Sequence, residues 1–229
     1  MLCIGHRGAM GHEPENTLLS IKKAISLGVD AIEIDVHNVE NKLVVIHDRD
    51  LARTTNGTGY LEHSSFVYVR SLDAGKGEQV PTLEEVFKTV DRQVIINIEL
   101  KGRNTAKLVI SLIQKYLKAG WSYTDFVVSS FDHDQLHQAK AICPKIITGM
   151  LIYGLPWQYL TSAQELGVAL IIPNLDYVTS KMIESVHQQG LQVWVYTVNQ
   201  PHDLKLMRAL GVDGVFTNYP ERVFSHDTD

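Results

Sequence analysis

Residues 31–48, AIEIDVHNVENKLVVIHD, decide the fold that this sequence specifies. Glu33 and Asp35 lie two positions apart in a run of Ile and Val, which predicts a β-strand with both carboxylates on one face. Two acids on one face of a buried strand repel each other and are costly to bury unpaired. We therefore expect a cation between them, and a divalent ion held by oxygen ligands is the simplest candidate. An exposed edge strand with an acidic polar face is the alternative.

The same stretch contains a turn. Residues 38–42 are too few for a helical crossover and too polar to be buried, so residues 43–47 are expected to return as the second arm of a hairpin. The return ends at His47 and Asp48, which would bring an imidazole back beside the two carboxylates.

Outside the hairpin the chain alternates apolar strands with capped helices. Helix starts are indicated by Asn16-Thr17, by the capping box from Thr82 to Glu85, by Asp132 with Gln135, by Thr179 and by Pro201. Besides the first hairpin arm, strands are expected at residues 2–5, 94–101, 126–131, 146–152, 169–173, 192–197 and 214–217. Eight such strands favour a closed TIM-type (β/α)8 barrel over an open sheet.

Residues 48–80 break this alternation, because they are rich in glycine, charge and turn-forming residues. We expect them to form a small insertion after the hairpin, and residues 1–229 to form one barrel domain. The length of 229 residues suits a single barrel of this kind.

Composition excludes several classes of protein. The formal net charge of -5 argues against nucleic acid as a partner, since such proteins usually carry a basic excess. No run approaches the ~20 apolar residues of a membrane span, and no export signal is expected at the N-terminus. Two cysteines, Cys3 and Cys143, suggest no disulfide framework and favour a reducing cytoplasm. No dinucleotide fingerprint or P-loop is present.

Polar residues gather at the carboxyl ends of the first three expected parallel strands. In a barrel these ends converge on one mouth, where active sites are found. The residues are His6, Arg7, Glu33, Asp35, Glu99 and Lys101, with His47 returning on the hairpin. Carboxylates suit Mg²⁺ or Ca²⁺, the two basic groups suit an anionic oxygen, and two imidazoles suit proton transfer near neutral pH. The set predicts cleavage of a phosphate ester, although a structural ion-pair network is the alternative for the charged residues.

The sequence resembles the glycerophosphodiester phosphodiesterase family over essentially the whole chain. Its motifs here are His6-Arg7-Gly8, Pro14-Glu15-Asn16-Thr17, Glu33-Ile34-Asp35, His47-Asp48, Leu51 to Gly59, Pro81 to Glu85, Glu99-Leu100-Lys101, Ser130-Phe131, Thr197-Val198-Asn199 and Thr217-Asn218-Tyr219-Pro220. The resemblance implies a TIM-type barrel and hydrolysis of glycerophosphodiesters to sn-glycerol 3-phosphate and an alcohol, with a divalent cation.

By motif position, the resemblance also implies roles for individual residues. It makes His6 and His47 the acid/base pair, although one of them could instead be a further metal ligand. Glu33, Asp35 and Glu99 are implied as metal ligands, and Arg7 and Lys101 as phosphate contacts.

Other residues are less clearly assigned. Tyr196 and Phe131 are candidates for contact with substrate, although an aromatic side chain at a strand end is as often packing. His37 and His12 are further candidates for the pocket lining, and Arg53 could equally brace the insertion.

Two positions depart from the family pattern. Tyr196 stands where the family often has Trp, and Trp194 precedes it on the same strand face, so either ring could contact the glycerol carbons. Asn218 stands where the family usually has Asp, and we expect this change to remove a rim charge without affecting the chemistry.

Three other functions share features of this sequence. A lysophospholipase D-like phosphodiesterase would use the same chemistry at phosphorus with a wider pocket. A catalytically silent barrel that binds phosphodiesters would keep the fold without the reaction, because fold alone does not fix function, but the presence of both histidines favours turnover. A glycoside hydrolase would need two carboxylates, without two histidines and two basic groups beside them.

Overall fold

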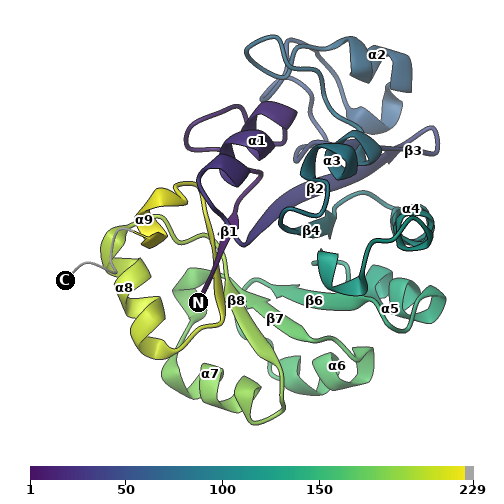
Figure 1. Cartoon of the computed structure of the whole chain (residues 1–229). Coiled ribbons are helices and arrows are strands. Elements are labelled where there is room, and N and C mark those ends of the chain that lie inside the picture. The colour runs from purple at the N-terminus through teal and green to yellow at the C-terminus, as the bar shows by residue number, and fades with distance from the viewer. Residues whose placement is uncertain (225–229) are drawn as a thin grey trace.

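A closed ring of eight parallel strands forms the centre of the computed structural model, which describes residues 1–224 (Figure 1). The strands are β1 (Leu2–Gly5), β2 (Ala31–Val39), β4 (Ile95–Leu100), β5 (Phe126–Ser130), β6 (Ile147–Ile152), β7 (Leu170–Pro173), β8 (Gln192–Val195) and β9 (Gly214–Thr217). β1 pairs in parallel with both β2 and β9, which closes the ring. The predicted TIM-type barrel is confirmed.

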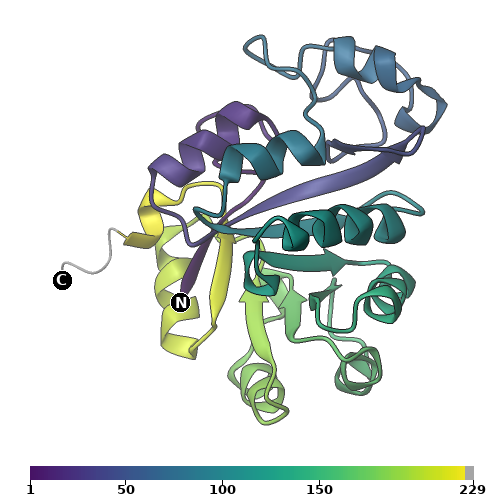
Figure 2. The same cartoon turned by 45° about the vertical axis from the view of Figure 1, so that its right-hand side comes forward.

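Helices follow the strands and cover the outside of the ring (Figures 1 and 2). They are α1 (Leu18–Ser26), α3 (Leu83–Val90), α4 (Ala106–Lys118), α5 (His133–Ile142), α6 (Tyr159–Leu166), α7 (Ser180–His187), α8 (Pro201–Leu210) and α9 (Glu221–Phe224), with short 3-10 turns η2 (Tyr123–Asp125) and η3 (Leu175–Tyr177). The expected caps start three of them: Thr17 caps α1, Thr82 and Glu85 form a capping box on α3, and Thr179 caps α7.

The start of α5 differs from the sequence expectation. Asp132 makes no side-chain capping hydrogen bond within the described chain, and Gln135 turns away to the neighbouring helix α4. Its amide oxygen accepts from Thr105 Oγ1 at 2.6 Å and from the backbone N–H groups at the start of α4, and its Nε2 donates to the Gly102 carbonyl. A buried amide must satisfy both its donor and its acceptor, and the adjacent helix start offers partners for both.

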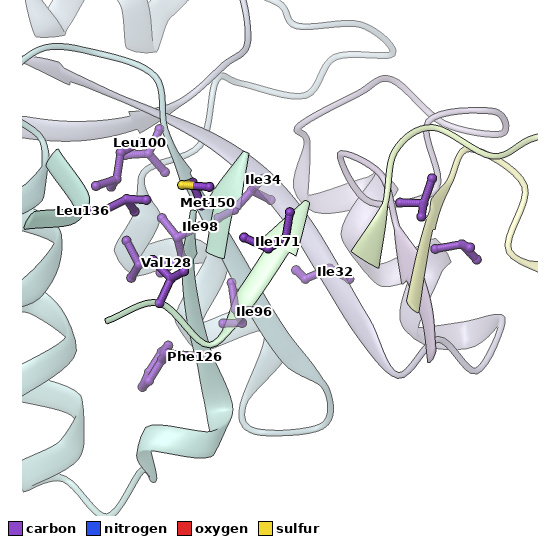
Figure 3. Packing of buried hydrophobic residues seen from close by; sticks show 14 of the residues in the cluster. Ile32, Ile34, Ile96, Ile98, Leu100, Phe126, Val128, Leu136, Met150 and Ile171 are labelled. Carbon is purple, nitrogen blue, oxygen red and sulfur yellow. The ribbon is translucent and has the colours of Figure 1, made fainter. Parts of the chain in front are cut away.

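Alternate residues of each strand face opposite sides of the barrel wall. Ile32, Ile34, Ile96 and Ile98 point outward into the large core between strands and helices (Figure 3). A second apolar cluster fills the barrel interior: Ile4, Ala31, Val127, Leu151, Leu170, Ile172, Trp194 and Phe216. Because Glu33 and Asp35 alternate with the outward isoleucines, they project into the barrel, next to this apolar filling.

The hairpin and the segment after it lie outside the ring. β3 (Lys42–Val45) pairs antiparallel with the end of β2, with Val36 opposite Val45. The following segment holds the 3-10 turn η1 (Leu61–His63) and the helix α2 (Phe66–Ser71), and it sits at the outer end of the hairpin (Figures 1 and 2). It has its own small core: Val39, Val44, Ile46, Leu51, Leu61, Val69, Leu72, Ala74 and Val80.

Over residues 1–224, no helix is both long enough and apolar enough to cross a bilayer.

Candidate active site

A cavity of about 440 Å³ opens at the carboxyl ends of the barrel strands. Eight of the nine predicted site residues line it: His6, Arg7, Glu33, His47, Glu99, Lys101, Phe131 and Tyr196. The ninth, Asp35, is 1% exposed and contacts two of these residues, Arg7 and Lys101. The structure therefore brings all nine together.

Three carboxylates form the acidic centre of the cavity. Glu33 and Asp35 come from β2 and Glu99 from β4, and the paired register places Asp35 opposite Glu99. One oxygen of each lies within 4.8 Å of the others. Glu33 Oε1 and Asp35 Oδ1 are buried and have no hydrogen-bond partner among residues 1–224. An all-oxygen donor set in which two buried oxygens accept no hydrogen bond from the described residues fits a hard divalent cation such as Mg²⁺ or Ca²⁺.

Burial places this acidic cluster under electrostatic strain. Burial and the neighbouring Asp35 carboxylate raise the pKa of Glu33 well above its usual range. The same two causes raise the pKa of Glu99 to about 7. A bound cation would stabilise the charged form of the carboxylates, so the metal-free cluster tends to bind either protons or a metal ion.

Two cationic side chains flank the carboxylates. Arg7 Nε lies 3.3 Å from Asp35 Oδ2, and the Arg7 backbone N–H donates to Glu33 Oε2 at 2.9 Å. Lys101 Nζ lies 3.1 Å from Glu99 Oε1. When the three carboxylates are ionised they outnumber these two cations, and a divalent ion would offset the excess negative charge, so that the cavity could accept an anionic ligand.

His6 follows β1 and lies beside Glu33, with 3.9 Å between His6 Nε2 and Glu33 Oε2. Burial, with the nearby Arg7 charge, lowers the pKa of His6 to about 4, so the ring is neutral near pH 7. Its Nδ1–H donates to Asn218 Oδ1 at 2.8 Å, which leaves Nε2 deprotonated and directed toward the carboxylates.

His47 follows β3 and lies beside Lys101. Its Nδ1 donates to Asp48 Oδ1 at 2.5 Å, and its Nε2 accepts from Lys101 Nζ at 2.9 Å. His37 is nearly buried, and its Nε2 donates to the His47 carbonyl at 3.1 Å. His37 therefore helps to hold the backbone of His47 in place.

An aromatic wall lines part of the cavity. The rings of Phe131 and Tyr196 meet edge to face, with 5.8 Å between their centroids, and both line the cavity. Tyr196 OH donates to the Ile152 carbonyl at 3.0 Å, which fixes the ring. Trp194 is 2% exposed and packs against Phe216 inside the barrel, so Tyr196 supplies the exposed ring of that strand.

Sequence reasoning was wrong about Asn218 and missed Asn97. Asn218 contacts His6 directly, so its side chain belongs to the site and not to a remote rim. Asn97 lines the cavity, is 1% exposed and stands opposite Glu33 in the strand register. Its position two residues before Glu99, on the same strand face, is the signal that would have found it.

His12 is not part of the cavity. Its Nε2 pairs with Glu221 Oε2 at 2.9 Å, and its ring lies edge to face with Tyr219. Arg53, in contrast, reaches the site through Asp48 and Glu15.

The closed barrel and the position of its polar cavity place the chain among the TIM-barrel enzymes, whose active sites lie at this face. The chain belongs to the glycerophosphoryl diester phosphodiesterase family, whose family model matches residues 6–222.

Individual relatives agree with this assignment. The chain is 34% identical to a glycerophosphodiester phosphodiesterase of Caldanaerobacter subterraneus subsp. tengcongensis, over 98% of this chain and 96% of that protein. It is 31% identical to a glycerophosphodiester phosphodiesterase of Bacillus subtilis, over 96% and 84%. A phosphodiesterase of Oleispira antarctica, solved with its product sn-glycerol-3-phosphate, superposes with a TM-score of 0.91 at 29% identity, over 98% of this chain and 96% of that one.

Proposed function

We propose that this chain hydrolyses glycerophosphodiesters to sn-glycerol 3-phosphate and an alcohol, with Mg²⁺ or Ca²⁺ held by Glu33, Asp35 and Glu99. The observation that carries the proposal is a buried carboxylate cluster, two of whose oxygens accept no hydrogen bond among residues 1–224, with one imidazole beside Glu33 and another beside Lys101. Family membership and the product-bound Oleispira antarctica structure support the choice of substrate.

The bound cation would polarise a phosphoryl oxygen and neutralise its charge. Arg7 and Lys101 line the cavity beside the carboxylates and contact the remaining phosphate oxygens. One of the pair His6 and His47 takes a proton from the attacking nucleophile, and the other gives a proton to the leaving alcohol oxygen. His6 lies beside Glu33 and His47 beside Lys101, so the two rings reach the cavity from different neighbours, as separate proton acceptor and donor require.

The aromatic wall would hold the organic part of the substrate. Phe131 and Tyr196 present apolar ring surface to the cavity, and three glycerol carbons offer matching surface. The cavity of about 440 Å³ lies in the range of small-molecule sites.

A cytoplasmic location is a further part of the proposal, and the two free, buried thiols Cys3 and Cys143 support it.

Release of sn-glycerol 3-phosphate tests the proposal. Metal-stripped protein is incubated with glycerophosphocholine or glycerophosphoethanolamine, and Mg²⁺ or Ca²⁺ is added back separately. We expect release that depends on the added ion, and the more effective ion identifies the cofactor. Absence of release with both ions and both substrates would contradict the proposal and favour a lysophospholipid substrate or a silent binding barrel.

A further inference from the structure

One guanidinium, that of Arg53, joins two loops of the site. Arg53 lies in the segment after β3, and its Nη1 and Nη2 donate to the two carboxylate oxygens of Glu15 at 2.9 and 2.8 Å. Its Nε donates to Asp48 Oδ2. Glu15 belongs to the loop between β1 and α1, and Asp48 follows the hairpin, so Arg53 bridges segments that share no strand pairing.

Each of these carboxylates also holds a side chain of the cavity. Glu15 Oε1 accepts from Arg7 Nη1 at 2.7 Å, and Asp48 Oδ1 accepts from His47 Nδ1 at 2.5 Å. The contacts therefore run from Arg7 through Glu15, Arg53 and Asp48 to His47. They connect the side chain proposed to bind phosphate with one proposed to move a proton.

We propose that Arg53 is a positioning residue that fixes Arg7 and His47 relative to each other; this inference rests on the proposed function. The planar, forked guanidinium can hold two carboxylates at fixed angles at once, whereas a lysine ammonium presents a single point charge. Without the guanidinium, Asp48 and Glu15 lose a shared partner, and the imidazole and guanidinium that they hold are free to turn away from the phosphate.

We expect the contacts of Arg53 with Glu15 and Asp48 to affect the placement of Arg7 and His47 more than the free energy of unfolding. The Arg53 side chain is 45% exposed, so water screens its ion pairs and limits their contribution to the free energy of unfolding. Small displacements of reacting groups, in contrast, reduce rates strongly, because the barrier depends on alignment.

Arg53→Ala tests the proposal against a matched control, Arg49→Ala. Arg49 lies in the same segment and is also paired with a carboxylate, that of Glu62, but its side chain is 71% exposed, and within residues 1–224 it forms no ion pair with Glu15 or Asp48. We expect Arg53→Ala to lower kcat by ~10- to 100-fold, as loss of supporting partners usually does, with a smaller change in KM. Arg49→Ala is expected to retain wild-type kcat, and the two variants are expected to unfold at similar temperatures.

Two further measurements separate geometry from charge. Free guanidinium added to Arg53→Ala is expected to restore part of kcat, because it can occupy the space between Glu15 and Asp48 that the Arg53 side chain fills in the wild type. Arg53→Lys keeps the charge without the fork, and it is expected to remain well below wild type. Full activity of Arg53→Lys, or wild-type kcat in Arg53→Ala, would overturn the proposal.

A spectroscopic readout does not depend on turnover. The proton that His47 Nδ1 donates to Asp48 is expected to give a downfield NMR resonance in the wild type and in Arg49→Ala. The resonance is expected to be lost or broadened in Arg53→Ala and in Asp48→Asn. An unchanged resonance in Arg53→Ala would contradict the positioning role. A wild-type protein that shows the resonance but hydrolyses no glycerophosphodiester would refute the proposed function instead.

Discussion

His6 and His47 differ in the group that holds Nδ1 of each ring. His6 donates to the neutral amide of Asn218, and His47 donates to the carboxylate of Asp48. The carboxylate of Asp48 and the ammonium of Lys101 both contact His47, whereas a neutral amide contacts His6, so the two rings occupy unequal electrostatic environments. Unequal environments suit a pair in which one ring accepts a proton and the other donates one.

Replacing either histidine is expected to abolish turnover and leave the fold intact. General acid or base catalysis typically contributes ~10²- to 10⁴-fold, so His6→Ala and His47→Ala should each lower kcat by that order. Release of sn-glycerol 3-phosphate at saturating metal measures the loss, and circular dichroism checks the fold. His12→Ala is the control, because His12 pairs with Glu221 outside the cavity. Near-normal rates in both cavity variants would refute the acid/base assignment.

Glu99→Gln is expected to weaken metal binding first. The substitution keeps the size of the side chain but removes one of three negative charges from the cluster. We expect the Kd for Mg²⁺ or Ca²⁺ to rise ~10-fold or more, measured by titration calorimetry. Glu84→Gln, on the exposed face of α3 beside Lys115, is the control and should bind metal normally. An unchanged Kd in Glu99→Gln would remove this residue from the ligand set.

At the scale of single elements, the loop between β1 and α1 is built around close backbone contact. Gly8 has φ +83, and a Cβ there would lie 2.5 Å from Ser20 Oγ and 2.6 Å from the Ser20 carbonyl carbon. Arg7 itself adopts φ 52, which points its backbone N–H at Glu33. The tight packing of this loop on α1 therefore helps to hold a site residue in an uncommon conformation.

Gly8→Ala is expected to destabilise the protein more than Gly28→Ala. Gly28 has a similar φ of +81, but no other described atom lies within 4 Å of a Cβ placed there. Gly28→Ala should cost about 1 to 2 kcal/mol of unfolding free energy for the left-handed conformation alone. Gly8→Ala adds the clash with α1, so we expect about 3 kcal/mol or more. Urea unfolding at equilibrium measures both, and equal losses would show that the clash is relieved at little cost.

Elements with a local signal could be predicted from the sequence. The strands followed from apolar runs, and the starts of α1, α3 and α7 followed from capping residues. Gln135 could not be predicted in the same way, because its partners at the start of α4 are about 30 residues away and only helix packing brings them together.

The residues of the candidate site also differ in whether a local sequence pattern could predict them. Glu33, Asp35 and Glu99 were predictable because strand alternation fixes their direction. The contacts of Asn218 with His6 and of Arg53 with Glu15 join segments 212 and 38 residues apart, so no local pattern specifies them.

For the whole molecule, the buried carboxylates link folding stability to pH. In the metal-free protein the pKa of Glu99 is raised to about 7, and that of Glu33 is raised well above its usual range. The folded chain therefore holds protons that the unfolded chain has already released. The stability from these protons is complete below the unfolded pKa of about 4.5, and it is lost as pH rises through the folded values.

Buried histidines change the unfolding free energy with pH in the opposite direction, and they do so at lower pH. Burial lowers the pKa of His6 to about 4 and also lowers that of His37. Below about pH 6.5 the unfolded chain binds protons at these rings more readily, so their contribution to stability rises as pH increases toward that value. Above it the histidines contribute little further change, and the carboxylates determine the slope.

We expect the unfolding free energy of metal-free protein to fall between about pH 6.5 and 8, by on the order of 1 to 3 kcal/mol. Urea unfolding across this range measures the slope. In Glu99→Gln the slope should be shallower, because the amide has no proton to release. Saturating Ca²⁺ or Mg²⁺ should reverse it, because the metal binds the ionised carboxylates and its affinity rises with pH. A metal-free protein whose stability is flat or rises across this range would show that burial does not raise the pKa values of Glu33 and Glu99.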